Sequence, residues 1–149
     1  MKKFKFKLQP LFTYKKYQER IAQQKTAKAH LDVKNCEQQI VDLEQTWDQQ
    51  ADIIENAIEK GIPASQFQRY YQYLAAVETS IVEERFRKIG LDKTLNEKLL
   101  ELKKKSVDKK AMELYCEKMK TQYNQEVIQI EQKELDEISI LKTARTKAQ

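Results

Sequence analysis

Glycine and proline are nearly absent from this chain of 149 residues, which contains two of each. An ordinary domain carries about 7% glycine and 5% proline, and an all-β fold needs many such turn residues, so the composition excludes one. No run approaches the ~20 consecutive apolar residues of a membrane-spanning helix, so we expect no transmembrane anchor. The opening stretch lacks the apolar core of a secretory signal.

Residue types that carry chemistry are also scarce. The one histidine, His30, and the two cysteines, Cys36 and Cys116, do not show zinc-ligand spacing. The two glycines stand 29 positions apart and cannot form a phosphate-binding loop. We therefore expect no metal, no cofactor, no catalytic residue and no enzymatic activity. The cysteines are expected to be small buried side chains, with an interhelical disulfide as the alternative.

The residues that are present favour long helices. Charged residues make up 34% of the chain and hydrophobic residues 40%, too much charge for a thick core and too much apolar character for disorder. Apolar residues recur at alternating spacings of four and three, which is typical of a coiled-coil seam. The stripe near the start is Leu11, Tyr14, Ile21, Ala29, Val33, Cys36, Ile40, Leu43, Trp47, Ile54 and Ala57. The stripe near the end is Leu95, Leu99, Leu102, Met112, Cys116, Met119, Tyr123, Val127, Ile130, Leu135, Ile138 and Leu141.

A narrow seam of this kind buries little unless a second helix packs against it. We therefore predict an all-α fold, an elongated antiparallel two-helix coiled coil. Gly61 and Pro63 predict a helix end and a turn, and Gly90 predicts a weaker break. The sequence thus indicates a single domain, 1–149, with an N-terminal tail (1–10), a first long helix (11–60), a tip helix (64–89) and a last long helix (91–147).

Charge distribution favours one register over another. Residues 1–28 have a net charge of +8 and residues 29–60 a net charge of −6. In a plain hairpin about Gly61, residues 1–28 would face residues 96–123, whose net charge is +3. If the termini meet instead, residues 1–28 face residues 126–149, whose net charge is −1. Because flanking charges select coiled-coil partners, we predict the second register.

In that register Cys36 lies within about one helical turn of Cys116. The same seams could instead pair between two chains, so a monomer and a coiled-coil dimer both stay open.

Two further stretches are candidate binding surfaces. Lysines alternate with Phe4 and Phe6 at the start of the chain, and Lys103 begins a run of three lysines. Acids interspersed after the lysine run weaken it as a nucleic-acid patch, and the basic pI of about 9.0 is better explained by protein partners with acidic surfaces. Seven large side chains cluster after the turn, too many for one seam: Phe67, Tyr70, Tyr71, Tyr73, Leu74, Val77 and Ile81. We assign Tyr71 and Tyr73 outside the seam and the other five, Phe67 included, to it. The cluster is then either a packed tip or a protein-binding hot spot.

Three blocks of sequence resemble the FliJ family, the small coiled-coil component of the flagellar type III export apparatus. They are FKFKLQPLF at the start, YYQYLAAVETSI in the middle and QKELDEISI near the end. The resemblance implies a fold like the stalk of the rotary ATP synthase gamma subunit. It also implies a cytoplasmic, non-enzymatic protein, associated with the cell membrane only through the export apparatus and acting in flagellum biogenesis and motility.

The family's partners would be the hexameric flagellar export ATPase, an export-gate membrane protein and export chaperones. The residues that the resemblance assigns to the ATPase contact are Phe4, Phe6, Leu8, Leu11, Lys133, Leu135, Asp136 and Glu137. Those that it assigns to the export gate are Tyr70, Tyr73 and Val77. The alternatives are a generic structural coiled-coil scaffold or adaptor and, less favoured, a basic protein that binds nucleic acid.

Overall fold

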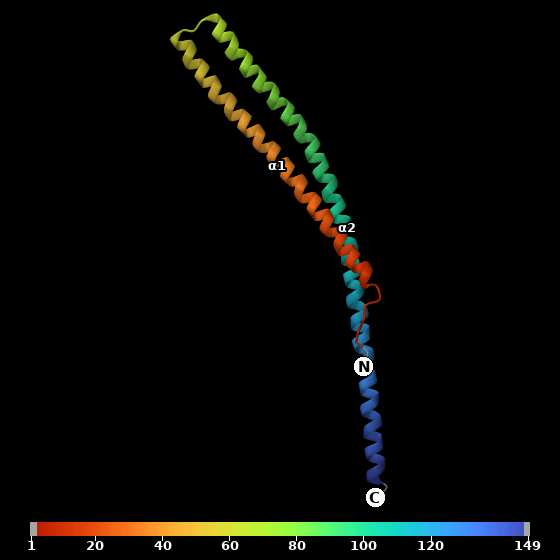
Figure 1. Cartoon of the computed structure of the whole chain (residues 1–149). Coiled ribbons are helices and arrows are strands. Elements are labelled where there is room, and N and C mark those ends of the chain that lie inside the picture. Colours follow the sequence, from red (N-terminus) through yellow and green to blue (C-terminus); the bar gives the residue numbers. More distant parts are fainter. Residues whose placement is uncertain (1–2, 148–149) are drawn as a thin grey trace. The chain divides into compact units, whose positions relative to one another are not determined.

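The computed structural model describes residues 3–147, with side chains from 3 to 145, and consists of two long helices joined by a short turn (Figure 1). Helix α1 spans Gln9–Lys60 and helix α2 spans Ala64–Lys147. The described residues contain no strand, and the all-α prediction is confirmed. Neither helix holds, within those residues, a stretch both long and apolar enough to cross a membrane.

The turn at residues 61–63 sets the two helices antiparallel. Gly61 has a φ of +82°, a left-handed conformation that costs other residues about 1–2 kcal/mol. Its N–H donates to the Ile58 carbonyl at 3.0 Å and closes α1. The Pro63 carbonyl accepts the N–H groups of Gln66 and Phe67 at 3.0 and 3.1 Å and opens α2. The turn predicted from the sequence is confirmed, and so short a connection makes the two helices direct neighbours.

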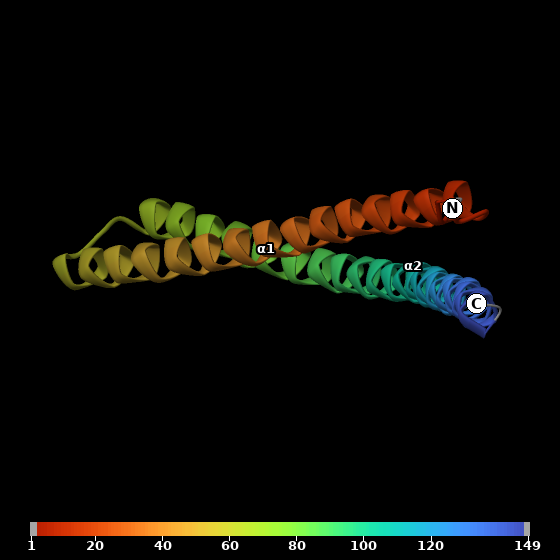
Figure 2. The ribbon, with the colours of Figure 1, turned by 90° about the horizontal axis from the view of Figure 1, so that it is seen from below.

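The chain forms two compact units. The turn unit is Arg20–Lys103. The terminal unit combines the described residues up to Glu19 with those from Lys104 onward. In the turn unit the two helices run alongside each other in both views (Figures 1 and 2).

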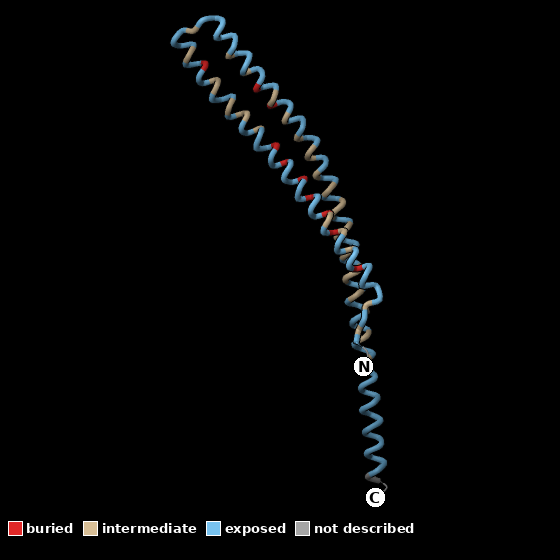
Figure 3. Tube along the Cα trace, viewed as in Figure 1, coloured by how far each residue is buried: buried red, intermediate tan, exposed pale blue. Residues whose placement is uncertain are grey.

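The core of the turn unit is a narrow seam, whose buried positions are red along the two helices in Figure 3. Its buried members are Ala22, Thr26, Ala29, Val33, Cys36, Ile54, Val77 and Ile81. Along α1 they recur at alternating spacings of four and three, as the sequence predicts, because that repeat keeps one helix face toward its partner.

Some residues assigned to the seam lie outside it. Trp47 is 36% exposed, Phe67 46% and Leu99 40%. Next to Leu99, Lys98 occupies the seam position instead. It is half-buried, and its ammonium lies 3.5 Å from the Glu101 carboxylate. A lysine can do this because its aliphatic stem packs while its charge reaches water.

At the start of α1, too, residues next to the predicted ones occupy the seam. Leu11 and Tyr14 are 43% and 53% exposed, whereas Phe12 is 9% exposed and Glu19 is buried. Glu19 continues the three-four repeat of the seam. Because Glu19 is polar, a stripe drawn through apolar residues alone misses it and passes through neighbouring positions instead.

Helix α2 runs through Gly90 without a break, so the predicted division into helices 64–89 and 91–147 is wrong. An interior glycine lowers helix stability by about 0.5–1 kcal/mol relative to alanine but keeps its hydrogen bonds. The half-buried residues Lys88 and Leu91 lie on either side of it, and Lys88 pairs with Glu37 of α1. The first helix also begins at Gln9, two residues before the predicted start.

The predicted register is wrong as well, because the helices pair as a plain hairpin about the turn. In the terminal unit Lys15 lies 3.1 Å from Asp108. In the turn unit Lys88 lies 3.1 Å from Glu37. The described part of the basic stretch 1–28 therefore faces residues 96–123, the arrangement that the net charges disfavour.

Individual positions explain why the net charges misled. Glu19, the one acid among residues 1–28, has its carboxylate 2.6 Å from the Lys109 ammonium. Charges that do not meet across the seam lie exposed in water and interact weakly. Cys36 consequently packs against Glu84 rather than near Cys116, and both thiols are free.

Candidate partner-binding surfaces

The N-terminal segment, residues 3–8, packs along α2 in the terminal unit (Figure 1). The Phe4 and Tyr123 ring centroids are 5.6 Å apart, and those of Phe6 and Tyr115 are 5.9 Å apart. Both phenylalanines are half-buried, while the lysines between and beside them are exposed. In an extended chain successive side chains point to opposite sides, so this alternation turns the rings inward and the ammonium groups outward.

This packing divides the predicted N-terminal contact residues into two groups. Phe4 and Phe6 already cover the protein's own α2. Leu8 and Leu11 are 40% and 43% exposed and face solvent. The outward lysines are Lys3, Lys5 and Lys7. The surface that this end offers is therefore cationic with two accessible leucines.

The C-terminal segment, residues 128–145 of α2, is exposed along its whole length. The predicted contact residues Lys133, Leu135, Asp136 and Glu137 all lie in it, and Leu135 is 66% exposed. Its other exposed apolar residues are Ile128, Ile130, Ile138, Ile140 and Leu141. A helix rises about 1.5 Å per residue, so this predicted set begins about 15 Å along α2 from Tyr123. The predicted N-terminal and C-terminal contact residues thus lie at separate places on the terminal unit.

A buried ionic cluster in the terminal unit was not predicted. The Glu19 carboxylate accepts a hydrogen bond from the Ser106 hydroxyl at 2.7 Å and pairs with the Lys109 ammonium at 2.6 Å. These two partners, Lys109 first, hold the pKa of Glu19 below its usual range and outweigh the opposing effect of burial. The one feature of the sequence that could have indicated this cluster is spacing, because Glu19 continues the three-four seam repeat of Ala22 and Thr26. A polar seam residue fixes register, so we interpret the cluster as structural.

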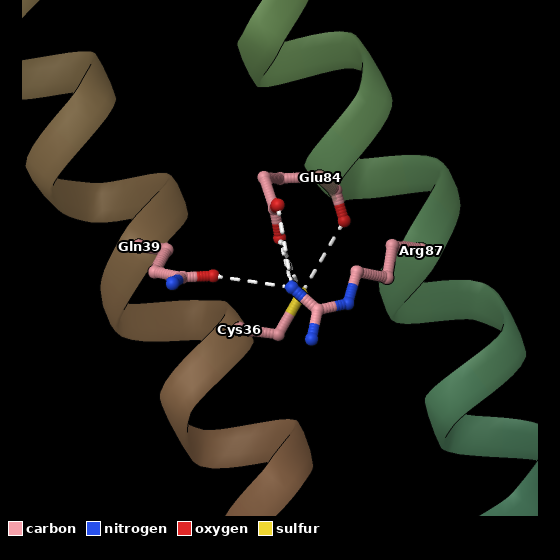
Figure 4. A network of polar contacts seen from close by, with 4 residues as sticks. All are labelled: Cys36, Gln39, Glu84 and Arg87. Carbon is pink, nitrogen blue, oxygen red and sulfur yellow. Dashed lines mark hydrogen bonds and ion pairs between the residues drawn. The ribbon is translucent and has the colours of Figure 1, made fainter.

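Cys36 belongs to a polar network in the turn unit (Figure 4). Its sulfur lies 3.4 Å from both the backbone carbonyl and the carboxylate of Glu84. The Arg87 guanidinium lies 3.4 Å from that carboxylate and from the Gln39 side-chain oxygen. Burial first, and then Glu84, raise the pKa of the Cys36 thiol. A buried, protonated thiol is a packing group rather than a nucleophile.

The tip segment, residues 64–77 next to the turn, presents aromatic rings on its surface. Of the residues predicted to contact the export gate, Tyr73 is 47% exposed, Tyr70 is half-buried and Val77 is 7% exposed in the seam. Tyr71, at 66%, and Phe67 add to the exposed aromatic surface. Tyr73 is therefore the predicted gate residue most accessible to a partner.

His30 is exposed, and among the residues that the structure describes no three His, Cys, Asp or Glu side chains gather as metal ligands would.

Comparison with known proteins agrees with this architecture. A structure from Chlamydia trachomatis described as that of a YscO homologue matches with a TM-score of 0.53 and 17% sequence identity, covering 99% of each chain. At that identity the likeness is one of fold. Among characterised proteins, no sequence matches the chain significantly. Residues 4–148 match the family model described as Flagellar FliJ protein. The chain therefore belongs to the FliJ family of flagellar proteins.

Proposed function

We propose that this protein is a non-enzymatic component of the flagellar type III export apparatus. It binds the hexameric export ATPase, the export-gate membrane protein and export chaperones, and promotes secretion of flagellar subunits. The observation that carries the proposal is the family match, which extends over residues 4–148. We place the protein in the cytoplasm, next to the membrane that holds the export gate.

The terminal unit supplies the contact with the ATPase. Its N-terminal segment presents Lys3, Lys5 and Lys7 on the solvent side, which suits an acidic protein surface. Leu8 and Leu11 are exposed beside them, and apolar side chains of this kind supply the contact that charge alone does not. The C-terminal segment adds a second contact through Leu135 and its charged neighbours.

The proposed mechanism needs no chemistry from this chain. A single helical hairpin has no rotational symmetry, so it cannot contact six identical subunits in the same way. It binds some subunit conformations better than others, and only such differential binding shifts a conformational equilibrium. The hairpin thereby promotes the nucleotide states that lead to hydrolysis.

The tip segment supplies the contact with the export gate. Tyr73 and Tyr71 are exposed on it, and tyrosine is enriched in binding hot spots because its ring buries area while its hydroxyl forms a hydrogen bond. This contact lies in the turn unit, so the gate and the ATPase use different parts of the chain.

The test measures ATP hydrolysis by the export ATPase of the same organism with and without the full-length protein. We expect stimulation by the wild type, loss of most of it in the triple variant Lys3→Glu, Lys5→Glu and Lys7→Glu, and no hydrolysis by the protein alone. These exposed lysines lie outside α1, so their reversal leaves the helices intact.

The matched control reverses three exposed lysines of the turn unit, Lys25, Lys28 and Lys34, which changes the net charge equally and should preserve stimulation. Stimulation that survives the N-terminal reversal excludes this segment as the ATPase contact. A wild type that neither binds nor stimulates the ATPase favours a structural scaffold instead.

A further inference from the structure

Gly90 is a helix-interior glycine that the fold of one chain does not require. Of the two glycines only Gly61 has a positive φ, and a Cβ added at Gly90 would meet nothing within 4 Å. Glycine there weakens α2 by about 0.5–1 kcal/mol relative to alanine. Neither backbone conformation nor close packing within the chain accounts for that weakness.

The helix face around Gly90 is apolar although it points to solvent. Val82, Phe86 and Ile89 are 60%, 77% and 67% exposed. An α-helix turns by about 100° per residue, so these three residues and Gly90 fall within one arc of about 100°. The seam residue Leu91 points away from this arc. We name Val82, Phe86, Ile89 and Gly90 the Gly90 face.

The Gly90 face combines a projection with a recess. Phe86 is the most exposed of the large hydrophobic side chains that the structure describes. Gly90, one helical turn further on, has no side chain and leaves the backbone open to close approach. Phe86 could therefore pack closely against a second helix wherever a glycine leaves the backbone of that helix accessible.

We propose that the Gly90 face binds the Gly90 face of a second copy of this chain, with the two α2 helices antiparallel across a two-fold axis. A two-fold interface must be self-complementary, so that residue i faces residue j and j faces i. Phe86 of each copy then packs over Gly90 of the other.

Charge complementarity identifies the second copy as the occupant. The pairing of residue 86 with residue 90 also brings residue 83 opposite residue 93. These residues are Glu83 and Lys93, which are exposed and carry opposite charges. The two-fold axis repeats this pair, so two Glu83–Lys93 ion pairs flank the two Phe86–Gly90 contacts.

Few side chains take part, so the dimer is weak, and dilution separates it. The contact lies in the turn unit and uses none of the residues proposed to bind the ATPase or the export gate. Self-association and stimulation of the ATPase can therefore fail independently of each other.

The test is sedimentation equilibrium of the full-length protein in reducing agent, from low to high micromolar concentration. We expect the wild type to show a reversible monomer–dimer equilibrium. Gly90→Leu fills the recess, so the association constant should fall at least tenfold. Leucine is the better helix former, so the thermal midpoint of the dilute monomer should stay the same or rise. The control Leu31→Ser alters a residue of α1 that is 56% exposed and should leave association unchanged.

Charge exchange tests the antiparallel pairing itself. Glu83→Lys alone places like charges opposite each other and should weaken association, as should Lys93→Glu alone. The double variant restores opposite charges in a second copy and should recover association. A wild type that is monomeric at every concentration, a Gly90→Leu variant that dimerises normally, or a double variant that fails to recover would each overturn the proposal.

Discussion

The buried carboxylate of Glu19 allows a quantitative test of the register. Glu19→Gln keeps the size of the side chain and an oxygen for the Ser106 hydroxyl but removes the charge that attracts Lys109. Hydrogen bonds to charged groups contribute about 1.5–3 kcal/mol. The Lys109 side chain is 31% exposed, so water partly replaces its lost partner. We expect the free energy of unfolding at neutral pH to fall by about 1.5 kcal/mol, between values for exposed and buried pairs.

The same substitution predicts a pH dependence of defined sign. Lys109 and Ser106 hold the pKa of Glu19 in the folded chain below its usual range, whereas an unfolded glutamate titrates near pH ~4.3. The stability gained from the ionised carboxylate is therefore present above pH ~4.3 and lost as the pH falls through the folded pKa. The difference between wild type and Glu19→Gln should shrink accordingly.

Urea unfolding followed by circular dichroism, at neutral pH and at acid pH, measures both effects. Glu113→Gln is the control: Glu113 pairs with Lys110 within one helix rather than across the seam, so its loss should change the midpoint much less than Glu19→Gln does. Lys109→Met completes a double-mutant cycle that isolates the Glu19–Lys109 coupling. Equal midpoints for wild type and Glu19→Gln, or a difference that persists at acid pH, would refute the assigned pairing.

Three further predictions concern other parts of the chain. Cys36 should react with iodoacetamide more slowly than Cys116, because burial raises the pKa of its thiol; equal rates by mass spectrometry would contradict its burial. Gly61→Ala should lower the unfolding free energy by about 1–2 kcal/mol because φ is positive there, and an unchanged urea midpoint would show that the turn relaxes. In a background with both native cysteines replaced by serine, Lys15→Cys with Asp108→Cys should cross-link under mild oxidation, whereas Tyr14→Cys with Ile140→Cys should not; the reverse result would restore the register in which the termini meet.

The seam of the turn unit follows from the sequence because its physics is local. Ala29, Val33 and Cys36 repeat at the coiled-coil spacing, and each is buried as predicted. The turn is equally local, since Gly61 and Pro63 stop one helix and start the next. Spacing and turn chemistry can be determined from short stretches of sequence, so these features needed no knowledge of the rest of the fold.

The register depends on interactions between distant residues, and sequence reasoning failed there. Net charge over a segment does not tell which ion pairs form, and the Glu19–Lys109 pair joins residues far apart in the chain. The assignment of Leu99 to the seam failed for a related reason, because Lys98 beside it also packs through its stem. Apolar spacing cannot distinguish two adjacent residues when one is amphipathic.

The sequence identified residues for the candidate surfaces but not how accessible each of them is. The sequence singled out Phe4 and Phe6 as contact residues, but their rings pack on Tyr123 and Tyr115. Composition cannot reveal this, because it depends on where the N-terminal segment meets α2. The exposure of Leu135, in contrast, is consistent with a contact role.

If this protein promotes export of flagellar subunits, as we propose, the amount of secreted filament protein should depend on it. The gene is deleted in the organism that encodes it, and flagellar filament protein is quantified in the culture medium. We expect a severe loss of secreted protein, restored by the wild-type chain but poorly by the Lys3, Lys5 and Lys7 charge-reversal variant. Secretion that is undiminished by the deletion would contradict the proposed role in export.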